Sequence, residues 1–220
     1  MEHKERHLRT ASIIDQAKLN GRPVAVVGCG AIGSHLAKML AQMGVSRIDL
    51  VDFDLVDATN LGSQGFAEAD LDKPKTQAVS ETIKKLDSRI EVNAHNGRWE
   101  RGMFKGDYAI FACVDCMTIR KHIFNDWVRS KDMQFFVDGR MAAESLVVYA
   151  VDKENPESIG HWRKNWFPNS EAIHSGCTAK STIYCASMAA ATMATLYKQW
   201  VMGQIVKEEV VFNLLAMECA

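Results

Sequence analysis

The chain has 220 residues, of which 47% are hydrophobic and 24% charged, a balance typical of globular proteins rather than disordered or fibrous ones. It carries 26 Lys and Arg against 27 Asp and Glu, so its net charge of −1 gives no reason to expect duplex nucleic acid or an anionic membrane as the main partner. A small anionic ligand is still compatible, because it needs only a few local cations.

The compartment is predicted from the N-terminus and the cysteines. Residues 1–9 are polar and lack the apolar run of a signal peptide, and no stretch approaches the roughly 18 apolar residues of a membrane span. The six cysteines are scattered along the chain, and at this length a full core forms without disulfide or metal crosslinks. We therefore expect a cytoplasmic protein with free thiols.

Strands and helices alternate along the sequence. In chain order the pattern predicts a strand at 23–27, a helix at 32–43, a strand at 47–51, a loop to about 71, a helix at 75–86, strands at 90–94 and 108–113, a helix at 118–128, strands at 135–137 and 146–151, a long loop at 152–176, a helix at 179–201 and a strand at 210–215. This alternation predicts a Rossmann-like, doubly wound α/β fold with a mostly parallel sheet, helices on both faces and antiparallel last strands. We expect one domain spanning 1–220, with an N-terminal arm at 1–21.

Ligands of such sheets bind at the carboxyl ends of the strands, where this sequence places Gly28, Asp52, Cys113 to Asp115 and Asp138. The first of these ends carries Gly28-Cys-Gly30-Ala-Ile-Gly33, a G-x-G-x-x-G loop between a strand and a helix. Such glycines permit a tight turn, backbone approach to a phosphate and close helix packing, and Asp52 follows where an acid holds ribose hydroxyls. The alternative is a glycine loop that serves packing alone. The loop by itself does not choose among NAD, FAD and ATP.

The following segment is more specific. It reads Asp52-Phe-Asp54-Leu-Val-Asp57-Ala-Thr-Asn60-Leu61-Gly-Ser-Gln64, then Asp72-Lys-Pro-Lys75, and it resembles the ThiF/MoeB/E1 family of ATP-dependent activating enzymes. The N-terminal Arg6-His-Leu-Arg9-Thr, Cys113-Val-Asp115-Cys116 with Arg120, and Cys177-Thr-Ala-Lys are similar to further family segments, so the resemblance runs from about residue 6 to 203.

The resemblance implies that the chain activates the C-terminal carboxylate of a ubiquitin-like or sulfur-carrier protein or peptide as an acyl-adenylate. Both reactants are anionic, so catalysis depends on positioning and charge neutralisation. The resemblance implies ATP and Mg²⁺, and it implies nucleotide-binding roles for Gly28, Gly30, Gly33, Asp52, Asp54, Asn60, Gln64 and Lys75.

Three further residues receive roles on the same basis. Lys75 and Arg9 are cations suited to neutralising phosphates, and Asp115 is a hard oxygen ligand suited to Mg²⁺ shared with phosphates. Arg9 of a second subunit would reach the site in a homodimer. The structural alternatives are a solvated charge for Arg9 and a helix N-cap for Asp115.

The sequence departs from the family at Ser63, where the family has an arginine that clamps the triphosphate. A serine hydroxyl brings neither charge nor a bidentate fork. Another cation would have to replace it, with Arg140, Lys73 and Lys180 as candidates; otherwise ATP turnover is weak or absent. Cys116 also replaces the asparagine that follows the family's metal ligand.

The cysteines divide by context. Cys177, at a predicted helix start, is the candidate thiol for accepting the activated acyl group, with His174 as a possible assistant; a packed cysteine and a surface histidine are the alternatives. Packing is expected for Cys29, Cys185 and Cys219. Cys113 and Cys116 form a single Cys-x-x-Cys pair, whereas a structural zinc site needs four ligands, so we predict no zinc.

The 152–176 segment carries Trp162, Trp166 and Phe167, which either grip an extended peptide or cover the core. Three functions follow: an adenylyltransferase, a catalytically impaired nucleotide- or protein-binding relative consistent with Ser63, and a nicotinamide dehydrogenase. The last leaves Asn60, Gln64 and Lys75 without a role.

Overall fold

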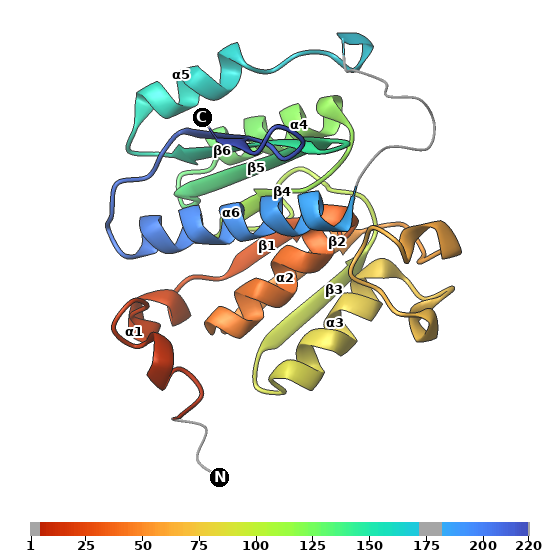
Figure 1. Cartoon of the computed structure of the whole chain (residues 1–220). Coiled ribbons are helices and arrows are strands. Elements are labelled where there is room, and N and C mark those ends of the chain that lie inside the picture. The colour runs from red at the N-terminus through yellow and green to blue at the C-terminus, as the bar shows by residue number, and fades with distance from the viewer. Residues whose placement is uncertain (1–4, 172–181, 220) are drawn as a thin grey trace.

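The computed structural model describes residues 5–171 and 182–219. Within them one sheet of eight strands has the order β3-β2-β1-β4-β5-β6-β7-β8. The pairs from β3 to β5 are parallel and those from β5 to β8 antiparallel, which confirms the predicted fold class. The elements, labelled in Figure 1 where there is room, are η2 (Leu8–Thr10), α1 (Gln16–Asn20), β1 (Val24–Val27), α2 (Ala31–Met43), β2 (Arg47–Asp52), η3 (Ala58–Asn60), η4 (Glu68–Asp70), α3 (Lys75–Leu86), β3 (Glu91–Asn96), β4 (Ala109–Ala112), α4 (Met117–Arg129), β5 (Phe135–Ala142), β6 (Ser145–Asp152), α5 (Pro156–Lys164), η5 (Asn169–Glu171), α6 (Ile183–Val201), β7 (Glu209–Asn213) and β8 (Glu218–Cys219).

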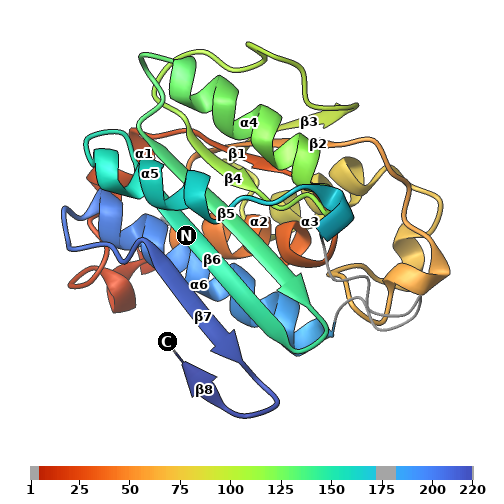
Figure 2. The same ribbon diagram turned by 90° about the horizontal axis from the view of Figure 1, so that it is seen from above.

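Helices cover both faces of the sheet, and each face has its own core. Alternate residues of β1 enter different cores: Val24 and Val26 pack with α2, α3 and α6, whereas Ala25 and Val27 pack with α4 and α5. Figure 2 shows α4 and α5 on one side of the sheet and α2 and α6 on the other. The fully buried β1 is typical of a central strand in a doubly wound sheet.

The parallel register brings the predicted strand ends together. Val27 pairs with Val51 on one side and with Ala112 on the other, and Ala112 pairs with Asp138. The residues that follow these strands therefore share one edge of the sheet, hereafter the carboxyl edge, as the sequence predicted.

The predicted loop at 152–176 is wrong for part of its length, because α5 lies within it. Asn155 caps this helix by accepting hydrogen bonds from the backbone N–H groups of Glu157 and Ser158 at 3.0 and 3.4 Å, and Pro156 occupies the first helical turn. Trp162 is 1% exposed and anchors the helix on the sheet.

Strand β5 is also longer than predicted, since it continues through Gly139 to Ala142 and pairs with β6 along its whole length. A Cβ at Gly139 would lie 2.4 Å from the Met193 sulfur of α6. The glycine therefore allows the Met193 side chain of α6 to pack closely against β5.

The N-terminal arm packs at the opposite edge of the sheet. Arg6 lies 3.7 Å from Asp87, just after α3, and the His7 ring lies close to Gly44, which caps the C-terminal end of α2. Both helices begin at the carboxyl edge, so Arg6 contacts the end of α3 that lies about 18 Å, one helix length, from Lys75, and Arg9 is exposed in η2. None of the helices in the described ranges combines the length and apolarity needed to span a bilayer.

Candidate active site

The three glycines of the loop after β1 have different surroundings. Gly28 has a φ of +92°, and a Cβ there would lie 2.8 Å from the Cys113 carbonyl group. A Cβ at Gly33 would lie 1.8 Å from the Gly28 carbonyl oxygen, whereas one at Gly30 would meet only the Gln64 Oε1, at 3.9 Å. Gly28 and Gly33 are thus required for packing, and the space above Gly30, at the N-terminus of α2, is left open for an anion.

Asp52 supports the glycine loop from the end of β2. Its carboxylate accepts hydrogen bonds from the backbone N–H groups of Cys29 at 2.6 Å and Asp54 at 2.8 Å. Burial raises the pKa of Asp52 above its ordinary value, and these two hydrogen bonds partly oppose that rise. Ribose binding by the same carboxylate stays a prediction.

Lys75 is held at the start of α3 by Asp54. Its ammonium lies 3.0 Å from the Asp54 carboxylate, and its backbone N–H donates to the Asp54 carbonyl at 2.9 Å. Lys75 is 7% exposed. A long, flexible cation is thereby fixed at the carboxyl edge, beside the loop that Asp52 supports.

The segment between β2 and α3 places Asn60 and Gln64. The Asn60 Oδ1 accepts from the Asp57 N–H at 3.2 Å in a capping box, which leaves its amide nitrogen to donate. The Gln64 Oε1 is buried without a hydrogen-bond partner among the described residues and faces the space above Gly30. A buried amide without a partner is costly in a protein alone, and Gln64 is therefore a group that a ligand can satisfy.

Asp115 follows β4 at the same edge and is exposed. The N-cap of α4 is Cys116 and not Asp115, so the alternative of a capping role for Asp115 is wrong. Within residues 5–171 and 182–219 its carboxylate takes part in no hydrogen bond or ion pair, and no cluster of three or more His, Cys, Asp or Glu suits a metal. One free carboxylate fits Mg²⁺ that takes its other ligands from phosphates and water.

The cysteines of the described residues are unpaired thiols. Burial raises the pKa of Cys113 to about 12 and that of Cys29 well above its ordinary value. At Cys116 burial raises the pKa, but hydrogen bonds from Asn169 and the α4 backbone outweigh it, and the pKa is lowered overall. Cys29 and Cys185 are packed as predicted.

Cys219 is exposed, so its predicted packing is wrong; it lies in β8, the short edge strand. Cys177, His174 and Lys180 lie outside the described residues.

Two of the three candidates for replacing the missing arginine are engaged elsewhere. Lys73 pairs with Asp70 at 3.3 Å and Glu81 at 2.7 Å. Arg140 is buried, lies 2.8 Å from the Asp138 carboxylate and donates to the Asn165 carbonyl. Both side chains therefore already have carboxylate partners, Lys73 at the surface and Arg140 in the interior.

Sequence reasoning overlooked one cation beside Ser63. Lys38 of α2 donates from its ammonium to the Gly65 carbonyl at 2.8 Å, and Ser34 accepts from the Gly65 N–H at 2.9 Å. Burial lowers the pKa of Lys38. Lys38 could have been found in the sequence because it lies four residues after Ser34, which places both side chains on the same face of the helix.

The aromatic residues after β6 mainly cover the core. Trp162 stacks on Phe124 with a centroid distance of 3.7 Å and donates to the Asp138 carboxylate at 2.9 Å. Trp166 is half-buried and donates to the Met117 carbonyl at 2.9 Å. The sequence left two interpretations of this segment, which were gripping an extended peptide and covering the core. For Trp162 the structure favours covering the core.

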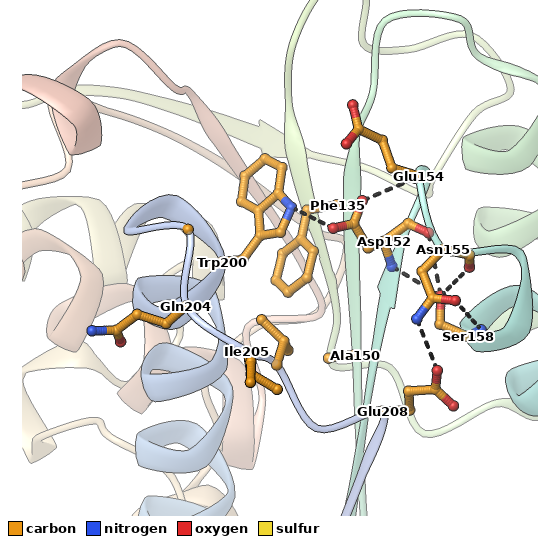
Figure 3. A pocket seen from close by; sticks show the side chains of 12 residues that line it. Phe135, Ala150, Asp152, Glu154, Asn155, Ser158, Trp200, Gln204, Ile205 and Glu208 are labelled. Carbon is orange, nitrogen blue, oxygen red and sulfur yellow. Dashed lines mark hydrogen bonds between the residues drawn. The ribbon is translucent and has the colours of Figure 1, made fainter.

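A cavity of about 450 Å³ lies at the opposite edge of the sheet, between the ends of α6 and β6. Figure 3 shows Trp200 donating to Asp152, and Asn155 donating to Glu208. The carboxylates of Asp152 and Glu208 have partners within the protein, and the lining contains no residue of the glycine loop. It is therefore separate from the candidate active site.

Comparison with known proteins shows the family of the chain. Residues 4–218 match the ThiF family, and the chain belongs to that family. The relatives in this family include E1-like adenylyltransferases.

Two curated relatives and one solved structure illustrate the similarity. The mouse adenylyltransferase and sulfurtransferase MOCS3 is 33% identical over 116 residues, 50% of this chain and 25% of the relative. The Pseudomonas aeruginosa ATP-dependent ubiquitin transferase-like protein Cap2 is 33% identical over 94 residues, 41% of this chain and 17% of the relative. These matched regions amount to a quarter or less of the relatives' lengths. Escherichia coli MccB with MccA has a TM-score of 0.76 at 19% identity, covering 98% of this chain and 70% of that one, which shows the shared fold.

Proposed function

We propose that the chain is an ATP-dependent adenylyltransferase that activates the C-terminal carboxylate of a ubiquitin-like or sulfur-carrier protein or peptide. The observation that carries this proposal is the convergence, at one edge of the sheet, of an open glycine loop and a Lys75 ammonium fixed by Asp54 at 3.0 Å. Family membership supports the same reaction class, as does an MccB structure described as containing ATP.

In this reaction a carboxylate oxygen of the partner forms a bond to the α-phosphorus of ATP. The bond from that phosphorus to the bridging β-phosphate oxygen breaks, and pyrophosphate leaves with its electron pair. The N-terminus of α2 and Lys75 neutralise phosphate charge, and Asn60 donates to a phosphate oxygen. The Asp54 pairing holds Lys75 before substrate arrives, so little reorganisation is needed during the reaction.

Asp115 would hold Mg²⁺, which when bound supplies charge neutralisation to the phosphates. No other residue of the carboxyl edge needs to be a metal ligand, since Mg²⁺ in nucleotide sites is bound by one or two carboxylates and by substrate. We also propose Cys177 as the thiol that would accept the acyl group.

The proposal is tested by incubating the protein with Mg²⁺, ATP and candidate carriers that end in an extended C-terminal tail. We expect pyrophosphate and the carrier adenylate to form only with a cognate carrier, and a matched carrier with an amidated C-terminus to give neither. ATP hydrolysed to ADP and phosphate instead would contradict the proposal. A thermal-shift comparison of ATP with NAD separates it from the dehydrogenase, which would respond to NAD.

The second candidate is a family member that binds nucleotide or a partner without turnover. It is favoured by Ser63 together with the engagement of Lys73 and Arg140 in ion pairs. Such a protein would bind its partner equally with and without ATP and form neither pyrophosphate nor a carrier adenylate.

We further propose a homodimer in which Arg9 acts on the second copy. This proposal is supported by the arm, in which Arg9 is exposed and Arg6 packs at the edge opposite Lys75. Sedimentation would show a dimer, and mixing Arg9→Ala with Lys75→Ala would restore activity in the mixed dimers.

A further inference from the structure

Arg120 joins the end of β4 to the middle of β5. It extends from α4, and its side chain is 6% exposed. Its Nη1 donates to the carbonyl oxygens of Ala112 at 3.3 Å and Gly139 at 2.9 Å and to the Asp138 carboxylate, and its Nη2 donates to the Val114 carbonyl. A planar guanidinium with five donors suits such a fork of acceptors, and a lysine ammonium does not reproduce it.

The partner of Arg120 is a fully buried carboxylate shared with a second arginine. Asp138 also accepts from the Arg140 Nε at 2.9 Å and from the Trp162 Nε1 at 2.9 Å. The remaining contacts of the two arginines differ, because Arg140 donates to the Asn165 carbonyl after α5. If either arginine is replaced by a neutral residue, the other still pairs with Asp138. Substitutions at the two positions can therefore be compared directly.

The segment that Arg120 holds contacts the site directly. The Cys113 backbone is the surface against which Gly28 packs, and Asp115 follows Val114 immediately. The glycine loop has supports of its own, since the N–H groups of Gly28 and Cys29 donate to the Val51 carbonyl and to Asp52. Asp115 has no side-chain partner in the described ranges, so its position depends on the Val114 carbonyl and on the start of α4.

We propose that Arg120 is a positioning residue that holds Asp115 where it can serve as the ligand of nucleotide-bound Mg²⁺. This inference rests on the proposed function, in which Asp115 has that role. Groups that orient a metal ligand commonly change metal affinity by about 10–100-fold when they are lost, although they never touch the metal. Arg120 therefore affects the metal-dependent part of nucleotide binding more than the metal-independent part.

The test measures the affinity of the full chain for α,β-methylene ATP in Mg²⁺ and in EDTA, and takes the ratio of the two. This ratio is the gain in nucleotide affinity that Mg²⁺ provides. We expect Asp115→Asn to abolish the gain. We expect Arg120→Gln to reduce the gain about tenfold or more, while its nucleotide affinity in EDTA stays close to that of the wild type. Arg140→Gln is the matched control, because it removes a buried arginine from the same carboxylate without releasing Val114. Arg140→Gln should lose about as much stability as Arg120→Gln, but Mg²⁺ should still increase its nucleotide affinity as it does in the wild type.

A normal gain from Mg²⁺ in Arg120→Gln, or an equal loss in Arg140→Gln, would overturn the inference while leaving the proposed function intact. A wild-type protein that binds no nucleotide, or whose binding ignores Asp115, would instead refute the proposed function and the inference with it. If Arg120→Gln does not fold, Arg120→Lys keeps the charge and loses the fork. Failure of both to fold would show that Arg120 serves the fold and not Asp115.

Discussion

Two alanine substitutions in the glycine loop separate packing from ligand binding. The Cβ of Gly33→Ala would overlap the Gly28 carbonyl oxygen at 1.8 Å and lie 3.2 Å from a Val26 methyl group. Both neighbours are buried in the centre of the fold, so α2 or the loop has to move. The Cβ of Gly30→Ala meets no atom closer than 3.9 Å, but the Gly30 backbone, at φ −78° and ψ −141°, lies outside the α and β regions that alanine prefers.

The expected magnitudes follow from these distances. Because its Cβ overlaps backbone, Gly33→Ala should lower the free energy of unfolding by about 3 kcal/mol or more. For a chain of this size, that lowers Tm by roughly 6–12 °C. Gly30→Ala creates no overlap, so its cost in unfolding free energy is only the strain of this backbone conformation, about 1–3 kcal/mol. It should also weaken ATP binding about 10–100-fold, because the methyl group keeps phosphate from the backbone N–H groups of the α2 N-terminus.

Differential scanning fluorimetry and isothermal titration with ATP provide the two readouts. The substitution Gly62→Ala, where a Cβ would have no neighbour within 4 Å, is the control for both. A Gly33→Ala protein as stable as wild type would refute the packing argument. A Gly30→Ala protein with unchanged ATP affinity would refute the assignment of the open space above Gly30 to phosphate.

Three other substitutions have expected outcomes. Ser63→Arg, which restores the family's arginine, should tighten ATP binding about tenfold or more in titrations, and no gain would show that the arginine was not the missing group. Burial lowers the pKa of His35 from 6.5 to about 4, so the unfolded chain binds more protons between these values and stability falls on acidification through that window. For this half-exposed ring, the wild-type free energy of unfolding should fall by about 1–2 kcal/mol from pH 7 to pH 4.5 because of His35. Urea unfolding of His35→Gln at the two pH values should not show this fall, and a variant with the same pH dependence as wild type would contradict the prediction. Gly160→Ala, on the exposed side of α5, should stabilise the fold by about 0.5–1 kcal/mol with ATP affinity unchanged, and a lower Tm would argue against a regular helix there.

Much of the central fold was predictable because its signals are local. The helix predicted at 75–86 agrees with α3, since its apolar residues recur at helical spacing and Pro74 precedes it. The buried β-branched run before Gly28 predicted β1 for a similar reason. The glycine loop then placed the candidate site at the carboxyl edge without any three-dimensional information.

The errors occur where distant contacts decide the structure. The predicted strand ends at Val137, but β5 continues through Gly139 to Ala142 because it pairs with β6 along this length. Helix α5 was missed because its aromatic anchor disturbs the apolar period, although Asn155 followed by Pro156 is a helix-start signal that sequence reasoning overlooked.

The contacts of single site residues also divide into those set by local sequence and those set by the fold. Pairing of Lys75 with Asp54 agrees with the motif that contains both, whereas the engagement of Arg140 by Asp138 and Asn165 depends on the fold. Cys219 was predicted to be packed from residue type alone, and an edge strand exposes it. A sequence therefore identifies the types of groups at a site better than it identifies which of them are free to bind.

Exchange of labelled pyrophosphate into ATP tests the proposed function most directly, since it reports reversible attack on the α-phosphorus. With Mg²⁺ and a carrier that ends in a free carboxylate, we predict exchange that depends on the carrier and is lost in Asp115→Asn and Lys75→Ala. Carrier binding without exchange, or exchange that persists in both variants, would contradict an adenylyltransferase built on this edge of the sheet.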